Sequence, residues 1–389
     1  MLNDMRLTFK YRLRPTKRQA SLLNEQLEIC RSVYNSTLAV RKDAYRQHDE
    51  NLNYYKTAKL LPLWKINFCD MAKVHSQVLQ NVQIRVDLAF QAFFRRVKSG
   101  EKPGYPRFKG KGRYHSITYP QYGNGVKLVG NVLTLSKIGD VFVKLHRPVE
   151  GKIKTVTVHR DTVGKWYVHF SCLVEAQPLE PTLNIIGVDL GLKTFATLSD
   201  GCKIARQRWV KRDAADIARL QRKKERCAKG SPERRKVIHA LRHAYQRANN
   251  RRANFAHQES RKLVNTYQFI AFEKLDVQSI LSQGNRTLNR NIADAAWEQF
   301  VSSTVYKAEN AGRTVVLVNP HATTQECSGC GAIVHKDLNI RIHECPHCGL
   351  KLDRDLNAAL NILARGLASI GQRAVEAPAI AKGRSHNLP

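Results

Sequence analysis

The chain opens with apolar and polar side chains in strict alternation. The apolar positions are Met5, Leu7, Phe9, Tyr11 and Leu13, and the residues between them are basic or polar. This period of two predicts a strand with one buried face. After Pro15 the apolar residues recur every three or four positions, which predicts a helix. Its buried face carries Leu23, Leu27, Cys30, Tyr34 and Leu38, and helical patterning continues with interruptions to about residue 97.

A second block of β pattern follows a loop. Residues 98–113 are rich in glycine, proline and basic side chains, a composition typical of loops. Residues 126–135 predict a hairpin with Gly130 and Asn131 near its turn, and residues 166–174 alternate between apolar and polar positions. We expect the first strand and this block to close one small barrel, with the helical region inserted between them.

The pattern changes again from Ile185. The run IIGVDLG predicts a short buried strand, and Asp200 and Gly201 predict the turn of a hairpin behind it. Two helices follow, separated at Ser231 and Pro232, residue types that favour a helix cap and a first helical position. The apolar seam predicted for the second helix consists of Ile238, Leu241, Tyr245, Ala248 and Phe255.

The last third of the chain alternates strands and helices. Its pattern predicts a buried strand at residues 268–272, a helix over about 294–311 and a strand at 314–318. A final helix is expected over about 353–365, where Gly366 is typical of a helix end. The weakly patterned residues 367–389 are expected to form a disordered tail.

The charge balance points to a polyanionic partner. There are 65 Lys and Arg residues against 32 Asp and Glu, a formal net charge of +33. Basic side chains that contact phosphates release condensed counterions, so nucleic acid is the expected partner. Residues 206–262 hold 19 basic and 5 acidic residues, and this stretch is either a solvated face or a backbone-binding surface. The candidates for binding an RNA backbone are Arg222, Lys223, Lys224, Arg234, Arg235, Arg251 and Arg252.

Hydropathy and cysteine content indicate in which cellular compartment the protein is expected. No apolar run approaches the ~20 residues that span a bilayer, and the start of the chain has no signal-peptide core. We therefore expect a cytoplasmic protein with no membrane partner. Nine cysteines in such a protein argue against a disulfide framework.

Four of the cysteines have the spacing of a zinc ribbon. Cys327 and Cys330 form one CxxC pair, and Cys345 and Cys348 form a second pair after 14 intervening residues. Four thiolates fill a tetrahedral zinc site, which predicts one structural Zn²⁺ within residues 325–350. A glycine follows the second cysteine of each pair and favours the turn that each knuckle needs.

Three carboxylates stand at positions suited to metal binding. Asp189 ends the run IIGVDL, Glu273 ends the apolar strand QFIAFE, and Asp355 lies in the first turn of the last helix. Each has an ordinary interpretation as a turn, surface or helix-terminal charge. Together they suit two Mg²⁺ or Mn²⁺ ions that catalyse phosphodiester hydrolysis. Asp353 is the predicted helix cap, because Asp355 shares its helix row with Ala359 and Leu363 and suits the face toward the sheet.

These motifs in this order resemble the TnpB family of transposon-encoded RNA-guided DNA endonucleases, and more distantly the type V CRISPR effector nucleases. The segments that carry the resemblance are GVDLG, FEKL, the CxxC pairs preceded by TTQ, and DRDLNAALNI. The resemblance implies an α/β RuvC-type, RNase H-like nuclease domain interrupted by a zinc ribbon, after a wedge β-barrel that carries a helical recognition insert. The implied ranges are 1–13 and 98–180 for the barrel, 14–97 for the insert, 181–324 and 351–366 for the nuclease, and 325–350 for the ribbon.

The resemblance also implies the partners. They are a guide RNA from the transposon end and double-stranded target DNA carrying a short adjacent motif, in the cytoplasm and nucleoid of a bacterium or archaeon. The matching positions for reading the DNA motif are Tyr54, Ser76, Gln80 and Tyr119, although the local sequence departs from the family there. Asp189, Glu273 and Asp355 match the family's catalytic acids. The sequence does not specify an oligomeric state, and a monomer with RNA is expected.

Two alternative functions share these features. One is an RNA-guided repressor that binds DNA without cutting it, which the three intact acids argue against. The other is a transposase or resolvase that acts on DNA alone, since RNase H-like transposases use a similar acidic triad. A structured RNA that co-purifies with the protein would separate the endonuclease from the second alternative.

Overall fold

The computed structural model describes residues 4–207, 213–275, 285, 289, 291–292, 295–337 and 340–376. The chain divides into two compact units, Met1–Glu175 and Ala176–Pro389, and each is described by itself. Among the helices of the described part, none is long and apolar enough to cross a lipid bilayer.

A seven-stranded antiparallel sheet organises the first unit. Its strand order is β2-β6-β7-β1-β5-β4-β3. The strands are β1 (Asp4–Arg14), β2 (Ser116–Tyr119), β3 (Val126–Val129), β4 (Val132–Leu135), β5 (Gly139–Lys144), β6 (Lys152–Arg160) and β7 (Trp166–Glu175). Strand β1 pairs with β7 along its length and with β5 at its end. This confirms that the first strand joins the later β block.

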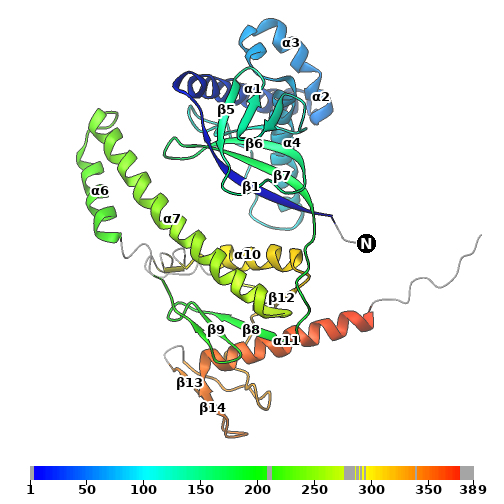
Figure 1. Cartoon of the computed structure of the whole chain (residues 1–389), viewed down its shortest axis with the longest axis vertical. Coiled ribbons are helices and arrows are strands. Elements are labelled where there is room, and N and C mark those ends of the chain that lie inside the picture. Colours follow the sequence, from blue (N-terminus) through cyan, green and yellow to red (C-terminus); the bar gives the residue numbers. More distant parts are fainter. Residues whose placement is uncertain are drawn as a thin grey trace, which may run out of the picture. The chain divides into compact units, whose positions relative to one another are not determined.

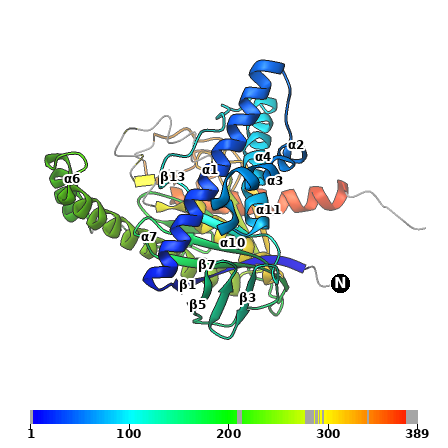
Figure 2. The same ribbon diagram turned by 90° about the horizontal axis from the view of Figure 1, so that it is seen from above.

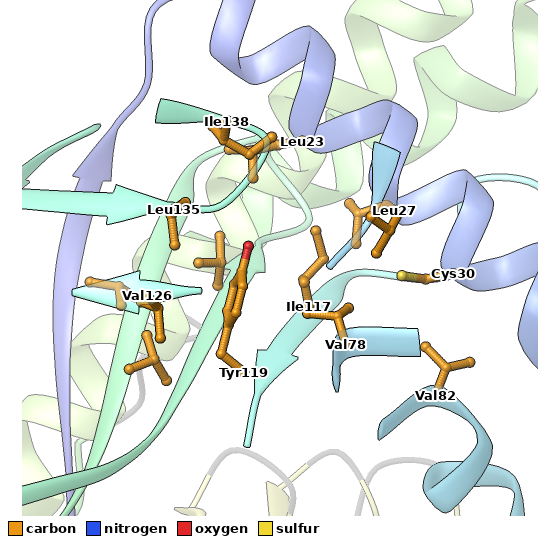
Figure 3. Packing of buried hydrophobic residues seen from close by; sticks show 14 of the residues in the cluster. Leu23, Leu27, Cys30, Val78, Val82, Ile117, Tyr119, Val126, Leu135 and Ile138 are labelled. Carbon is orange, nitrogen blue, oxygen red and sulfur yellow. The ribbon is translucent and has the colours of Figure 1, made fainter. Parts of the chain in front are cut away.

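The sheet curls around one apolar core. Every second residue of β7 is buried, which confirms the alternation expected there. The edge strands β2 and β3 contribute to the same core, and Figure 3 shows the ring of Tyr119 among Ile117, Val126 and Leu135. Because strands from both edges bury side chains in one interior, the sheet forms a barrel. The predicted hairpin joins β3 and β4, with Gly130 at a φ of 53°.

Along the sequence, a helical region lies between β1 and the other strands of this sheet. Its helices are α1 (Lys17–His48), α2 (Tyr54–Ala58), α3 (Leu60–Asn67), the 3₁₀ helix η1 (Cys69–Lys73) and α4 (Ser76–Lys98). Thr16 and Gln19 form a capping box that begins α1, and all five residues of the predicted buried face are buried. Helices α1 and α4 pack together (Figure 2), and Arg41 on α1 pairs with Asp87 on α4 at 2.8 Å.

A five-stranded mixed sheet organises the second unit. Its order is β10-β9-β8-β11-β12, with β8, β11 and β12 parallel and the β8-β9-β10 segment antiparallel. The strands are β8 (Ile185–Leu190), β9 (Ala196–Leu198), β10 (Lys203–Ile204), β11 (Phe269–Glu273) and β12 (Thr314–Val318). The predicted turn at Asp200 and Gly201 connects β9 to β10, where Gly201 has a φ of 87°.

Helices cover both faces of this second sheet. Helix α11 (Arg354–Glu376) packs on one face, and α10 (Trp297–Asn310) with the end of α7 (Pro232–Thr266) covers the other, whereas α6 (Ala214–Arg226) packs against α7. Ile270 and Phe272 of β11 share a core with Phe300 of α10, whereas the intervening Ala271 packs with Ile362 of α11. Burial on both faces explains why β11 is an uninterrupted apolar run. Figure 1 shows α11 running along the sheet.

The end of α11 differs from the prediction. The helix continues past Gly366 to Glu376, so the predicted tail is helical over residues 367–376. A Cβ at Gly366 would lie 2.7 Å from the Cβ of Ala271, so this glycine allows close packing on β11 and does not end the helix. Residues 377–389, the rest of the predicted tail, lie outside the described residues.

The junction of α6 and α7 agrees with the prediction, but the buried seam of α7 is different. Ser231 caps α7 by accepting a hydrogen bond from the amide of Arg234, and Pro232 is its first residue. Of the predicted seam, Ala248 is buried, Tyr245 is exposed, and Ile238, Leu241 and Phe255 are half-buried. The fully buried face also carries Val237, Ala244 and Ala256. Alanines on the inner face let neighbouring helices approach closely, a packing requirement that periodicity of large side chains does not reveal.

Candidate carboxylate site and zinc ribbon

The parallel pairing of β8 and β11 brings Asp189 and Glu273 to one edge of the sheet. The register pairs Val188 with Phe272, and the two acids are the next residues on their strands. Both carboxylates are largely buried, with exposures of 8% and 9%. Their convergence follows from the fact that parallel strands present their carboxyl ends on the same side.

Helix α11 adds the third acid. A Cβ at Gly187 would lie 2.1 Å from the carbonyl oxygen of Ala359 and 2.8 Å from the Cβ of Leu363, so the backbone of α11 rests directly on β8. The row of Ala359 and Leu363 thus faces the sheet, as expected, and Asp355 lies one turn earlier on that row. Gly187 is a packing position that sequence reasoning missed, because GVDLG was interpreted through its acid alone.

Asp353 caps α11. Its carboxylate oxygen accepts a hydrogen bond from the amide of Asp355 at 2.8 Å, which confirms the predicted role. Lys203 on β10 pairs with the other oxygen at 2.7 Å. Asp355 itself lies near two guanidinium groups, 3.4 Å from Arg354 and 3.8 Å from Arg341.

The electrostatics of the three acids favour a bound cation. Burial raises the pKa of Asp189 to about 8, and the negative charges of Glu273 and Asp355 add to the shift. Burial also raises the pKa of Glu273, although a hydrogen bond from Thr323 and the charge of Arg365 act in the opposite direction. Two buried carboxylates and the 17% exposed Asp355 carry the hard oxygen donors that suit Mg²⁺ or Mn²⁺, but their oxygens do not all lie within 4.8 Å of one another as the four sulfurs of the cysteines do.

The four cysteines of the predicted ribbon lie together. Their sulfur atoms all lie within 4.8 Å of one another, the only group of three or more potential ligands with this spacing in the described part of the chain. The Sγ atoms of Cys327 and Cys348 are 3.6 Å apart, as are those of Cys330 and Cys345. This donor set fits one tetrahedral zinc ion. Strands β13 (Ile342–Glu344) and β14 (Lys351–Asp353) flank the second knuckle.

The backbone of the ribbon is also arranged for thiolates. Gly331 and Gly349 have φ angles of 76° and 75°, so each knuckle uses a conformation that favours glycine. Burial alone would raise the pKa of Cys345, but amide groups of Cys348 and His347 and the neighbouring thiols lower it. Although a backbone amide acts to lower each, hydrogen bonds among the four thiols instead raise the pKa of Cys330 and of Cys348. Metal binding requires the thiolate form of each cysteine.

The candidate RNA-binding residues divide into two groups. Arg222 and Lys223 are exposed on α6. Arg234 donates to the carbonyl oxygens of Lys224 and Cys227, and Arg235 donates to that of Gly230, so both hold the turn between α6 and α7. Three further candidates have partners within the chain: Lys224 pairs with Glu225, Arg251 pairs with Asp213, and Arg252 donates to Asn249.

The candidates for reading DNA differ in their exposure to solvent. Ser76 and Gln80 are exposed on the first turns of α4, and Tyr54 is half-buried at the start of α2. Tyr119, in contrast, is 1% exposed and lies in the barrel core (Figure 3). It therefore presents no surface to DNA in this structure. The alternation of Ile117 and Tyr119 along β2 was the signal for burial that sequence reasoning did not use.

The raised pKa of Asp189 predicts how stability depends on pH. The ordinary pKa of this carboxyl is 3.8 and its folded-state pKa is about 8, so the folded protein binds the proton more tightly. Without Mg²⁺, stability should therefore fall as pH rises from about 4 to about 8. Asp189→Asn should flatten this fall, measured by urea unfolding in Mg²⁺-free buffer that retains zinc. Asp216→Asn, at an exposed position of α6, is the control and should not flatten it. An unchanged pH slope in Asp189→Asn would contradict the assignment.

Three protein-family models match parts of this chain. Residues 1–50 match a family described as "Helix-turn-helix domain", residues 169–283 match "Probable transposase", and residues 297–362 match "Cas12f1-like, TNB domain". Within the first range the structure contains β1 and the single helix α1, so residues 4–48 do not form a helix-turn-helix.

Two curated relatives cover most of the chain. A Streptomyces pristinaespiralis protein named "Putative RNA-guided DNA endonuclease" is 34% identical over 95% of this chain and 91% of its own length. The Escherichia coli K12 protein "Putative RNA-guided DNA endonuclease InsQ" is 30% identical over 83% of each chain. The solved Cas12f1–sgRNA–target DNA complex has a chain with the same fold, at a TM-score of 0.57 and 15% identity over 89% of this chain and 83% of that one.

Proposed function

The chain belongs to the TnpB family, and from this premise we propose that it is a transposon-encoded, RNA-guided DNA endonuclease. The observation that carries the proposal is the convergence of three intact acids on β8, β11 and α11. A protein that only bound DNA would have no need to bury carboxylates whose charges repel one another. Burial of an ionised carboxylate costs free energy unless a proton or a bound cation offsets its charge.

We assign the second unit to a RuvC-type, RNase H-like nuclease. Its support is the sheet order β10-β9-β8-β11-β12, in which an antiparallel hairpin continues into parallel strands. The proposed nuclease comprises residues 181–324 and 351–366, with the zinc ribbon at 325–350. The proposed wedge barrel comprises residues 1–13 and 98–180, and the recognition insert comprises residues 14–97.

The proposed site holds two divalent ions through Asp189, Glu273 and Asp355. Two such ions, when bound, stabilise the attacking and leaving oxygens of an in-line phosphodiester displacement. The chain's own contribution is to position the acids. Strand pairing aligns Asp189 with Glu273, and the cap at Asp353 together with the close contact at Gly187 positions Asp355.

The proposed partners are a guide RNA from the transposon end and a double-stranded DNA target. The net charge of +33 supports binding to phosphate backbones. Tyr54, Ser76 and Gln80 remain candidates for reading a target-adjacent motif, because their positions on α2 and α4 leave them accessible.

The test is native expression together with the flanking transposon end. The RNA that co-purifies should be sequenced, and the complex should be incubated with Mg²⁺ and plasmids that do or do not match its guide segment. We expect cutting of the matching plasmid alone. Cutting that does not need RNA would favour a DNA-only transposase or resolvase. Guided binding without cutting would favour a repressor.

A separate prediction concerns the exposed basic residues of α6. Replacing Arg222 and Lys223 by Gln should weaken RNA binding and reduce the slope of log affinity against log salt by about 1.5. The reason is that each phosphate contact releases about one condensed counterion on binding, so a variant with fewer contacts releases fewer counterions. The measurement is filter binding over a series of salt concentrations, with Ala218→Ser on the same exposed face as the control. An unchanged slope would mean that this face does not contact RNA.

A further inference from the structure

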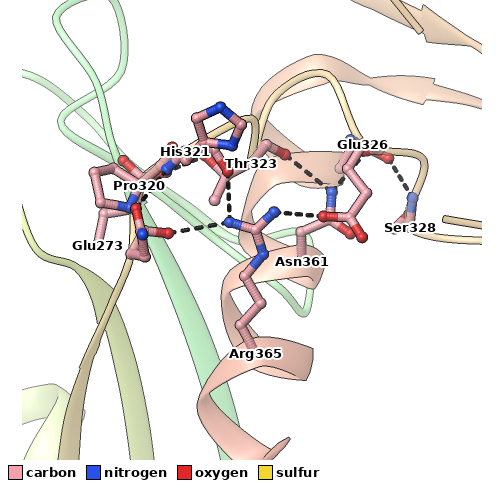
Figure 4. Close-up of polar contacts among 10 residues, drawn as sticks. Glu273, Pro320, His321, Thr323, Glu326, Ser328, Asn361 and Arg365 are labelled. Carbon is pink, nitrogen blue, oxygen red and sulfur yellow. Dashed lines mark hydrogen bonds and ion pairs between the residues drawn. The ribbon is translucent and has the colours of Figure 1, made fainter. Parts of the chain in front are cut away.

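The segment 319–328, here called the strap, joins β12 to the first zinc knuckle and passes beside Glu273 (Figure 4). Thr323 lies in the middle of the strap and is 2% exposed. Its hydroxyl donates to Oε1 of Glu273 and also lies 3.3 Å from the carbonyl oxygen of Pro320. A hydroxyl has one proton, and an ionised carboxylate is the stronger acceptor. The strap thus places a hydrogen-bond donor directly on a proposed catalytic acid.

Two buried asparagines of α11 form hydrogen bonds with the backbone of the strap. Asn361 donates to the carbonyl oxygen of Thr323 at 2.9 Å and to that of Glu326 at 2.7 Å. Asn357 donates to Glu326 at 2.7 Å, and its own oxygen accepts from the amide of Ser328 at 2.9 Å. Both side chains are nearly fully buried. These bonds satisfy strap carbonyl and amide groups that would otherwise be costly to bury.

Arg365 of α11 also contacts the strap. It donates to the carbonyl oxygens of Asn319 and His321, at 3.0 and 2.6 Å, and pairs with the carboxylate of Glu326 (Figure 4). Between these anchors the chain turns through Ala322, which has a φ of 57°. A non-glycine residue in this left-handed conformation is strained and persists where surrounding contacts hold it.

The anchors form one row of α11. Asn357, Asn361 and Arg365 are spaced four residues apart and so lie on one face of the helix. The neighbouring row contains Asp355, Ala359 and Leu363 and rests on β8. One helix therefore carries an acid on one row and, on the next row, holds the strap that contacts Glu273.

We propose that Thr323 is a positioning residue, which orients the Glu273 carboxylate for a divalent cation and couples the zinc ribbon to the carboxylate site through the strap. This inference rests on the proposed function, because it assigns a metal to Glu273. The strap begins at β12 and ends within the first knuckle, so folding of the ribbon on zinc fixes the far end of the segment that holds Thr323. Partners that orient a metal ligand typically change metal affinity about 10- to 100-fold when they are removed.

The test compares Thr323→Val with Thr323→Ser in the full-length protein. Valine keeps the shape and removes the hydroxyl, whereas serine keeps the hydroxyl. Mn²⁺ binding is measured by electron paramagnetic resonance, and zinc content and melting temperature are measured in the same samples. We expect Thr323→Val to weaken Mn²⁺ binding about 10-fold or more, with one zinc retained, and Thr323→Ser to stay close to the wild type. In the guide complex, Thr323→Val should also need more Mg²⁺ for half-maximal cleavage.

A purely structural role gives a different result. Both variants would then lower the melting temperature and leave the affinity for Mn²⁺ unchanged, which would overturn the proposal. If Thr323→Val does not fold, Thr323→Cys serves in its place, because a thiol is a weak donor of similar size. Mn²⁺ binding does not depend on RNA-guided cutting, so a protein that binds Mn²⁺ but cuts nothing would contradict the proposed function and still test Thr323.

Discussion

Asp355→Asn is expected to reduce RNA-guided DNA cleavage by several orders of magnitude, whereas Asp353→Asn should retain most of the activity. The two acids are two residues apart, but Asp353 caps α11 whereas Asp355 lies in its first turn. Asp355 belongs to the row that rests on β8, and its charge contributes to the raised pKa of Asp189. Asparagine at position 355 would remove the charge of a proposed metal ligand and leave the side-chain volume nearly unchanged.

The neighbouring substitution should be tolerated because its role is different. Asp353 accepts the amide hydrogen bond that begins α11, and asparagine caps helices about as well. The change also removes the ion pair with Lys203, but both side chains are partly exposed and such pairs contribute little.

The measurement is single-turnover cleavage of matched DNA by both variants, with target binding followed in Ca²⁺. Guided binding should survive in Asp355→Asn, and likewise in Asp189→Ala and Glu273→Ala, since these acids are proposed to hold metal and not nucleic acid. If Asp353→Asn lost more activity than Asp355→Asn, the assignment of the third ligand would be reversed.

Replacing Cys327 and Cys330 together with Ser should release zinc and abolish cleavage. Zinc binding in such ribbons is coupled to folding, so residues 325–350 should lose their structure. The strap ends at this knuckle, where Ser328 and Glu326 are bound by Asn357 and Asn361. Loss of the ribbon therefore releases the segment that holds Thr323 against Glu273.

Elemental analysis of the purified protein measures zinc, and cleavage assays measure activity on the same samples. The wild type should contain about one zinc per chain, as four thiolates require. Cys69→Ser, an exposed cysteine outside the ribbon, should retain both zinc and activity. A wild-type protein that contained no zinc would refute the ribbon assignment.

Local patterns along the chain were sufficient to predict several elements. The alternation in β1 and β7 and the helical spacing in α1 correctly identified the buried faces. Ser231 with Pro232 marked the start of α7, and Asp353 marked the start of α11. Such signals are local, because caps and periodicity depend on residues within one or two turns of each other. The spacing of the four cysteines was equally informative, since zinc restricts the ligand geometry strongly.

Where a pattern had two physical explanations, the sequence favoured the wrong one. Gly366 was interpreted as a helix end, but it is the point where α11 approaches β11 too closely for a side chain. Tyr119 was assigned to DNA reading, but its ring fills the barrel core. In both cases the deciding partner is remote in sequence, and a residue's type does not identify the element it will touch.

The sequence by itself determined which acids and thiols are available and on which elements they lie. Only the tertiary structure decided how these elements meet: Gly187 against the backbone of α11, and Thr323 against Glu273. The polar row of α11 was visible as a spacing of four, yet its meaning required the strap that it binds. The physical reason is that burial and hydrogen bonding between distant segments depend on the packing of the whole unit, which local periodicity does not encode.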